Sequence, residues 1–402
     1  MHQQFKIMQK IILILSFITT VNSYAQTIDS SKVQLKNSAQ TLIESKDGNL
    51  LMAAYGEVHF NQPMAKNTNY NGSLDVHRQV LLFGYKFDSK TSFITEIEIE
   101  HIKEVYLEQA FLNYKAKPWL NVQAGLLLIP MGIVNEYHEP TTFNGVERPL
   151  INSVITPTTW REIGAGVAGN IPSIGLRYQF YGVNGPLGFD QQEKLKGEKP
   201  IRGARQKGSQ VTMSDIDLSG RLTYYGVRGL NLGISGYFGK TESSLYNNLH
   251  EDSLFQKRQA DSSSIGVQIL SGDFRYQRKN LEARGEIIWM NLSNTEKYNA
   301  FTGQNIGETV YGYYAEIGYN LASILKSKNK LVPFIRYSNY DTHHQVTSSI
   351  VTNPSYKNNV ITGGLSWFLN PNFVVKGDYQ QITNGNNKTV NSLNLGVGYW
   401  FR

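Results

Sequence analysis

The chain has 402 residues, a formal charge of +7 at pH 7 and no cysteine. The lack of cysteine excludes a disulfide framework and a thiolate metal site. No block of Lys and Arg of the kind that follows phosphates is present, so the mild positive charge does not indicate a nucleic-acid partner. An aromatic content of 12%, with 24 Tyr and 36 Gly, favours an all-β protein.

The first elements in chain order are typical of an exported protein. A basic start, the apolar run "IILILSFI" and the small residues Ser23 and Ala25 predict a signal peptide over residues 1–25. The run is shorter than the roughly 20 apolar residues of a membrane-spanning helix; a buried N-terminal helix is the alternative, and Met8 is an alternative start. Because the segment holds two lysines and no acid, its removal lowers the formal charge from +7 to +5.

Residues 26–49 are polar and are expected to form a periplasmic tail or a short helix. From residue 50 to 402, segments of about ten residues alternate apolar and polar side chains and end in turn residues, which is the pattern of β-strands. In "LNLGVGYWFR", Leu393, Leu395 and Val397 share one face. Sixteen such segments are expected, at about 50–62, 74–87, 92–101, 104–116, 120–132, 160–170, 174–184, 214–227, 230–241, 263–278, 281–292, 308–322, 329–341, 358–370, 373–384 and 390–402.

The connections alternate in length. Every second one is short and turn-like, such as "DSKT" and "NPN", whereas those between are mostly long and include 133–159 and 186–213. This arrangement predicts a transmembrane antiparallel up-and-down β-barrel of about 16 strands, with short periplasmic turns and long extracellular loops. A β-sandwich or a propeller is the soluble alternative, but no sheet-dividing pattern and no blade-length repeat is present.

Several short motifs have ordinary explanations. "GAGVAG", at 164–169, matches the dinucleotide fingerprint, but Pro172 and another alternating strand follow where the fingerprint requires a helix. The histidines show no ligand spacing, so no cofactor and no metal is expected. An esterase that uses "GISG" and His138 is conceivable, but no motif supports it. The chain is therefore not expected to be an enzyme.

The connection 133–159 and the strand after it carry clustered charges and several prolines. A long loop of this kind is expected to fold into a wide barrel and narrow it; an outward surface loop is the alternative. In this prediction, its glutamates face Arg148 and Arg161. The candidate constriction residues are Glu136, His138, Glu139, Glu147, Arg148, Arg161 and Glu162. The candidate lumen-facing residues are Glu96, Glu98, Arg177, Arg221, Arg275, Arg284, Arg336 and Lys376.

The blocks "HEPTTFNGVERP" and "ITPTTWREIG" resemble a family of Gram-negative outer-membrane porins related to the phosphate-selective porin O/P type. The resemblance covers most of the chain from about Tyr55. It implies a sixteen-stranded, trimeric diffusion channel with an inward-folded third loop. Phosphate-selective members use lumenal arginines and a lysine cluster near the constriction, whereas this chain has no lysine between Ile133 and Trp160. Phosphate specificity is therefore not expected.

The sequence as a whole predicts an outer-membrane porin, a passive water-filled channel for small hydrophilic solutes or ions. Its expected partners are outer-membrane lipid, the solutes and two further copies in a homotrimer. The alternative is a barrel with a plugged lumen whose surface loops bind a ligand or a partner.

Overall fold

The computed structural model describes residues 37–45, 48–65, 68–247, 249–250 and 252–401. The expected signal peptide, residues 1–25, lies outside the described residues, as does the part of 26–49 that precedes residue 37.

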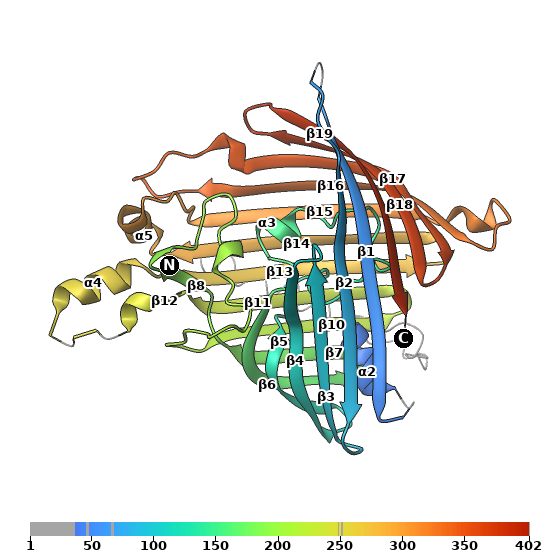
Figure 1. The fold of residues 1–402 in the computed structure, drawn as a ribbon, viewed down its shortest axis with the longest axis horizontal. Coiled ribbons are helices and arrows are strands. Elements are labelled where there is room, and N and C mark those ends of the chain that lie inside the picture. Colours follow the sequence, from blue (N-terminus) through green and yellow to red (C-terminus); the bar gives the residue numbers. More distant parts are fainter. Residues whose placement is uncertain (1–36, 46–47, 66–67, 248, 251, 402) are drawn as a thin grey trace.

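Sixteen antiparallel strands close into one barrel, in which β1 pairs with β19 (Figure 1). The predicted all-β barrel of 16 strands is therefore confirmed. The barrel strands are β1 (Leu50–Met64), β2 (Ser73–Lys86), β3 (Thr91–Glu100), β4 (Glu104–Lys117), β5 (Leu120–Leu128), β6 (Arg161–Ile171), β7 (Leu176–Val183), β10 (Asp217–Val227), β11 (Leu230–Lys240), β13 (Gly266–Arg278), β14 (Leu281–Ser293), β15 (Thr309–Tyr319), β16 (Lys330–Gln345), β17 (Lys357–Asn370), β18 (Phe373–Asn384) and β19 (Thr389–Phe401).

The two ends of the barrel differ. One end, the short-turn rim, carries connections such as 87–90, 228–229 and 371–372 and also the start of β1 and the end of β19. The other end, the long-loop rim, carries 129–160, 184–216 and 241–265. The remaining elements are α2 (Ser38–Glu44), α3 (Ile151–Val154), α4 (Leu254–Ser262), α5 (Thr295–Thr302), the small sheet of β8 (Leu187–Asp190), β9 (Gln192–Glu193) and β12 (Glu242–Ser243), and the 3-10 turns Pro172–Ile174, Arg202–Ala204, Ser244–Tyr246, Leu321–Ser323 and Pro354–Tyr356.

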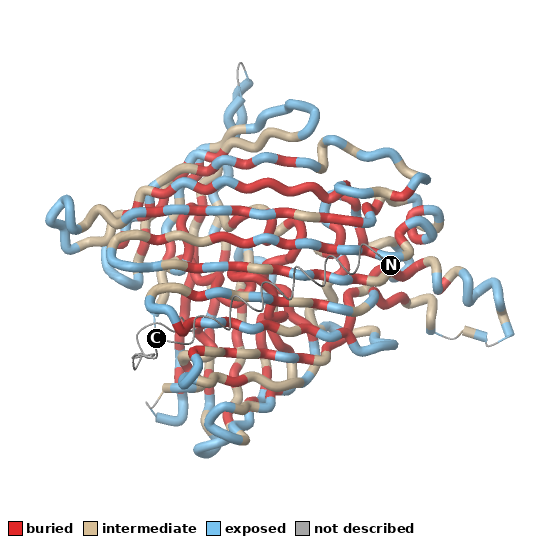
Figure 2. Tube along the Cα trace, turned by 180° about the vertical axis from the view of Figure 1, so that it is seen from behind, coloured by how far each residue is buried: buried red, intermediate tan, exposed pale blue. Residues whose placement is uncertain are grey.

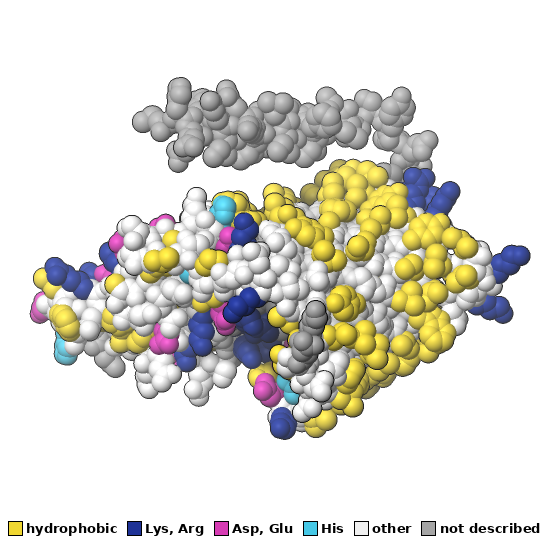
Figure 3. Space-filling model, turned by 90° about the horizontal axis from the view of Figure 1, so that it is seen from above, with side chains coloured by type: hydrophobic (Ala, Val, Ile, Leu, Met, Phe, Trp, Pro, Cys, Tyr) yellow, Lys and Arg dark blue, Asp and Glu magenta, His cyan; other side chains and the backbone are white. Residues whose placement is uncertain are grey.

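Side chains alternate between the inside and the outside along each strand, as Figure 2 shows by the alternation of buried and exposed residues. In β13, Asp273 and Arg275 are buried, whereas Leu270 and Phe274 are exposed by 53% and 38%. Large apolar side chains are exposed on the outside of almost every barrel strand, and in Figure 3 they cover the strand region while charges gather toward the ends. An apolar belt on a closed barrel is the surface that a bilayer requires.

Two β-bulges change which side chains face inward. The register of β1 and β2 shifts between Glu57 and Val58, so that His77 and Arg78 both reach the interior. The register of β3 and β4 shifts after Glu96, and Glu108 and Gln109 are consequently both buried. A bulge adds one residue to one strand and thereby reverses the inward and outward parity beyond it.

The interior is partly filled by loops. Connection 129–160, here called the inner loop, contains α3, which Figure 1 shows between the front and the back walls. Its Ile151, Ile155 and Trp160 belong to one apolar cluster with inward side chains of the wall, among them Ile288 and Met290. Leu195 and Ile201 of connection 184–216 join the same cluster.

Among the described residues, no helix is long and apolar enough to cross a bilayer.

Candidate site in the barrel interior

The inner loop hydrogen-bonds to inward side chains from strands all around the barrel. Its partners lie on β1, β2, β7, β14, β15, β16 and β18. A loop with partners on opposite walls crosses the lumen. The contacts fall into three clusters of buried charged residues.

The first cluster lies between β1 and β4. Arg78 donates from Nε to Oε1 of Glu57 at 2.6 Å, and its Nη2 donates to the carbonyl oxygen of His138. The guanidinium also lies over the ring of Tyr55, at 5.2 Å. Because Arg78 and Glu57 are almost fully buried, each charge needs the other to remain ionised at low cost.

His138 has an oxygen partner at each of its ring nitrogens. Its Nδ1 lies 3.1 Å from the carbonyl oxygen of Asn135, and its Nε2 lies 2.8 Å from the Tyr55 hydroxyl and 3.4 Å from Oε2 of Glu108. Burial alone would lower the pKa of His138, but the carboxylates of Glu108 and Glu96 outweigh it and hold this pKa well above 6.5. The inner loop therefore presents a cation to the acidic wall.

The second cluster lies on β7, β10 and β13. Arg221 makes a bidentate pair with Asp273, at 2.7 and 2.9 Å, and its Nε lies 3.3 Å from Oε2 of Glu136. Arg177 binds the same Glu136 oxygen at 3.1 Å and donates to the Tyr137 hydroxyl at 2.7 Å. A single loop carboxylate is thus held by two wall arginines.

The third cluster lies on β14, β15 and β16. Glu316 accepts from Arg336 at 2.7 Å and from Asn144 at 3.1 Å. Arg336 also donates to the Asn144 carbonyl, at 2.5 Å, and Arg284 donates to the Thr142 carbonyl, at 2.7 Å. Further wall contacts of the loop are Val146 to Asp378 and Asn152 to Glu286.

A cavity of about 160 Å³ lies on the long-loop side of the inner loop. One side is formed by acids and histidines of β1 to β3, including Glu57, His59 and Glu98. The other side is basic and includes Arg205, whose pKa burial lowers to about 10, so that it stays charged at neutral pH. The basic residues that line the cavity are Arg78, Arg148, Arg161, Arg202, Arg205 and Lys207, of which Arg78 and Arg148 lie beside Glu57.

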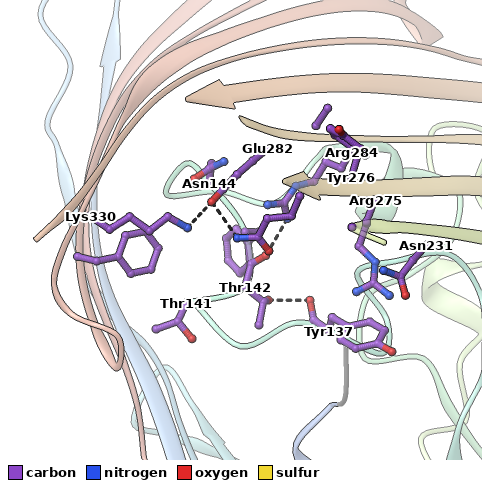
Figure 4. A pocket seen from close by; sticks show the side chains of 15 residues that line it. Tyr137, Thr141, Thr142, Asn144, Asn231, Arg275, Tyr276, Glu282, Arg284 and Lys330 are labelled. Atoms are coloured by element: carbon purple, nitrogen blue, oxygen red, sulfur yellow. Dashed lines mark hydrogen bonds and ion pairs between the residues drawn. The ribbon is translucent and has the colours of Figure 1, made fainter. Parts of the chain in front are cut away.

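A second cavity, of about 300 Å³, lies on the short-turn side (Figure 4). Arg275 and Tyr137 stack in it, with the guanidinium 3.9 Å from the ring centroid. In the part of the chain that the structure describes, no carboxylate lies within ion-pair distance of Arg275. Lys330 and Glu282 form an ion pair at the edge of the cavity, near the short-turn rim.

Phe143 of the inner loop lines both cavities. Only 4% of this residue is exposed, and its ring lies close to two basic side chains. The Lys376 ammonium lies 3.7 Å from the ring centroid, and the Arg148 guanidinium lies 5.9 Å from it. These contacts hold the ring, which is shared by the linings of the two cavities.

Helix α2 packs inside the barrel near the short-turn rim. Oε1 of Glu139 accepts from the amide and the hydroxyl of Ser38, at 3.1 and 2.5 Å, and the Trp400 indole donates to the same hydroxyl. Leu42 is buried beside Ile94 of the wall. The helix is thereby tied both to the inner loop and to the barrel.

The predicted site residues divide between these clusters. The lumen-facing set is largely buried, and Glu136, His138 and Glu139 of the loop bind the wall or α2. Glu147 pairs with His59 at 3.2 Å, and this pairing outweighs burial and lowers the pKa of Glu147. Glu136 and Glu147 thus pair with wall residues, and Glu139 binds α2, rather than Arg148 or Arg161. Arg161 lies against Tyr106, and Glu162 binds Trp160 and Asn184.

Several residues at these clusters were not singled out from the sequence. Alternation in "GEVHF" places Glu57 and His59 on one face and was a usable signal. Arg78 and Glu108 follow bulges, so alternation assigns them no reliable face. No sequence pattern identified Phe143 as a site residue, because an aromatic residue in a loop is usually part of an apolar core.

No family model matches the chain. Solved structures with the same fold include OmpF of Salmonella typhi in complex with daunomycin (TM-score 0.57, 11% identity, 89% of this chain and 99% of that chain). An anion-selective porin from Comamonas acidovorans (0.56, 11%, 88% and 99%) and the outer-membrane channel DcaP of Acinetobacter baumannii (0.54, 11%, 89% and 99%) are also similar. At this identity the likeness concerns the fold, which is that of outer-membrane porins.

A sequence relative comes from Aquifex aeolicus (strain VF5). This uncharacterized protein is 30% identical over 352 residues, which cover 85% of this chain and 77% of the relative. Two chains that match at this identity over this extent share a family. The chain therefore belongs to the same family as the Aquifex aeolicus protein, and its fold is the sixteen-stranded barrel of porins.

Proposed function

We propose that the protein is an outer-membrane channel for small hydrophilic solutes or ions, narrowed by its inner loop. The observation that carries the proposal is the pair of charged cavities on opposite sides of the loop, which share Phe143. In this proposal the short-turn rim faces the periplasm, and residues 50–402 form the channel domain behind a cleaved signal peptide, 1–25. Transport requires no covalent step and no cofactor.

The proposed constriction lies at Phe143 and at the charged residues around it. Arg148 and Lys376 hold the ring, and the pairs of Glu136 and Glu147 with the wall hold the loop. A loop with so many buried partners is rigid, so the opening is expected to be narrow and the conductance low. The chain is expected to assemble as a homotrimer, as the porin resemblance implies.

A plugged barrel is the second candidate. The observation that favours it is the apolar cluster of Ile151, Ile155 and Trp160 inside the lumen. Such a core excludes water from the part of the cross-section that it occupies.

Single-channel recording in a planar bilayer tests the channel. Wild-type protein should give small, stable openings, and Phe143→Ala should increase the conductance because it removes the ring between the cavities. Phe143→Leu, which disturbs packing less, should increase it by a smaller amount. Phe255→Ala, at an exposed position of α4, is the matched control and should leave the conductance unchanged. No openings from folded wild-type protein and from folded Phe143→Ala would favour the plugged barrel.

A further inference from the structure

Two histidines and an aspartate converge at the long-loop rim, near the cavity on that side. His101 Nδ1 lies 2.6 Å and His77 Nδ1 lies 3.5 Å from Oδ2 of Asp75. One possible ligand atom from each residue lies within 4.8 Å of the others. From this convergence we propose that Asp75, His77 and His101 bind a divalent transition-metal ion.

The donor set fits such an ion. Imidazole nitrogen and carboxylate oxygen bind zinc at about 2.0–2.2 Å, which places tetrahedral ligands about 3.4 Å apart. The distances of 2.6 and 3.5 Å between the Asp75 oxygen and the two histidine nitrogens lie on either side of this value. Small rotations of three partly exposed side chains therefore bring the donor atoms into position. Three protein ligands leave one coordination position that water can occupy.

The outer contacts of the site also suit a metal centre. The second nitrogen of His101, Nε2, lies 3.8 Å from Oε1 of Glu100. The ring of His77 stacks on that of His59, at 4.6 Å, and His59 is held between Glu57 and Glu147 at 3.3 and 3.2 Å. A carboxylate beside a ligating histidine orients the ring and increases its basicity, and Glu100 is placed for this role beside His101.

The backbone conformation at His101 is strained. His101 and Ile102 have φ values of +52° and +64° in the turn between β3 and β4. A turn with two successive residues at positive φ favours Asn-Gly, and a β-branched residue there is unfavourable. The amide of His101 donates to the carbonyl of His77, at 3.2 Å, so the turn holds the two histidines beside each other. Strain that persists at a cluster of donors is typical of functional sites.

The ion would bind from solution and change the charge at the cavity. The side chains of His101, Asp75 and His77 are 46%, 30% and 29% exposed, which provides an access route. His77 and Glu100 also line the cavity, opposite the basic side with Arg205. A bound divalent cation would reduce the negative charge of the acidic side and thereby favour anions. This second effect rests on the proposed channel function, whereas metal binding does not.

Isothermal titration of the folded, untagged barrel in detergent with ZnCl₂ tests the site, and Co²⁺ absorption spectra report histidine ligation directly. Wild-type protein should bind one ion at these residues. His101→Ala and His77→Ala should each weaken binding by at least about tenfold, since even outer partners of ligands are worth 10–100-fold. His344→Ala, at an exposed histidine that packs against Tyr311, is the control and should bind as wild type.

The outcomes separate site and channel. Absence of zinc binding at submillimolar concentration, or equal binding by His101→Ala, would overturn the site. In bilayers, zinc added on the long-loop side should shift the reversal potential toward that of chloride for wild type and not for His101→Ala. Zinc binding without this shift would support the metal site and overturn its proposed effect on ion selectivity. A barrel that binds zinc but never conducts would contradict only the proposed channel function.

Discussion

Arg336 and Glu316 lie directly opposite each other on β16 and β15, and the guanidinium Nε donates to the carboxylate at 2.7 Å. The same guanidinium donates to the carbonyl oxygens of Asn144 and Glu147 in the inner loop. This cross-strand ion pair of the wall therefore also holds the inner loop in place. Both residues are at least 96% buried, so neither charge is well solvated without the other.

Arg336→Met should release this part of the inner loop. Loss of one partner of a buried ion pair costs about 3–5 kcal/mol, and the variant also removes two hydrogen bonds to the loop. The unfolding midpoint in urea should fall, and single-channel records should show more noise. The double variant Arg336→Met/Glu316→Leu removes both charges of the pair and should recover part of the stability, but only part, because it also removes the carboxylate that lies 3.1 Å from Arg284 Nε. Equal stability of the single variant and the wild type would show that the pair does not hold the loop.

Stability should depend on pH through His138. The pKa of His138 is raised in the folded protein above its ordinary value of 6.5, so its protonation stabilises the fold. This contribution is complete below about pH 6.5 and is lost as the pH rises through the folded-state pKa. The difference in unfolding free energy between wild type and His138→Gln should therefore be largest at acidic to neutral pH and decrease in alkali. A difference that grew with increasing pH would contradict a protonated His138, and His344→Gln serves as the control.

Arg275 should contribute to anion preference. Its guanidinium lies in the cavity of the short-turn side without a carboxylate partner among the described residues, whereas most other interior charges are paired. Selectivity should therefore be weak in the wild type, and Arg275→Gln should shift the reversal potential in a KCl gradient toward that of potassium. Arg278→Gln, at an exposed position on the same strand, should have a smaller effect. Millimolar phosphate should not block the chloride current; a block would instead indicate a phosphate site.

Helix α2 should narrow the short-turn side. Leu42→Ala removes a buried side chain and should cost about 2–4 kcal/mol of its packing. The helix should then leave the wall more often, so that a cysteine at Ala39, which is buried in the wild type, reacts with a thiol reagent and the conductance rises. Leu254→Ala, at an exposed position of α4, is the control. Continued protection of position 39 in folded Leu42→Ala would mean that other contacts hold α2.

Orientation can be tested in whole cells with single cysteines at Asn370 and Lys199. Asn370 ends β17 at the short-turn rim, and Lys199 lies in the long connection 184–216. An impermeant thiol reagent should label position 199 and not position 370. Labelling of position 370 alone would reverse the proposed orientation.

The sequence by itself determined the barrel and its strands. Alternation with a period of two appears wherever one face contacts an apolar phase and the other a polar interior, and this local pattern does not depend on distant residues. All sixteen strands, from β1 to β19 in the closed order, lie close to the expected segments. The difference in connection length likewise required only the printed chain.

Tertiary structure alone decided what fills the lumen. The bulges that turn Arg78 and Glu108 inward depend on pairing with a neighbouring strand, and alternation within one strand does not reveal them. The partners of the inner loop come from strands far away in sequence, as in the contact of Asn144 with Glu316. The sequence therefore shows that the loop is charged but not which wall residue each charge binds. Closure of the barrel decides these partners, because only closure brings β7, β14 and β18 around the same loop.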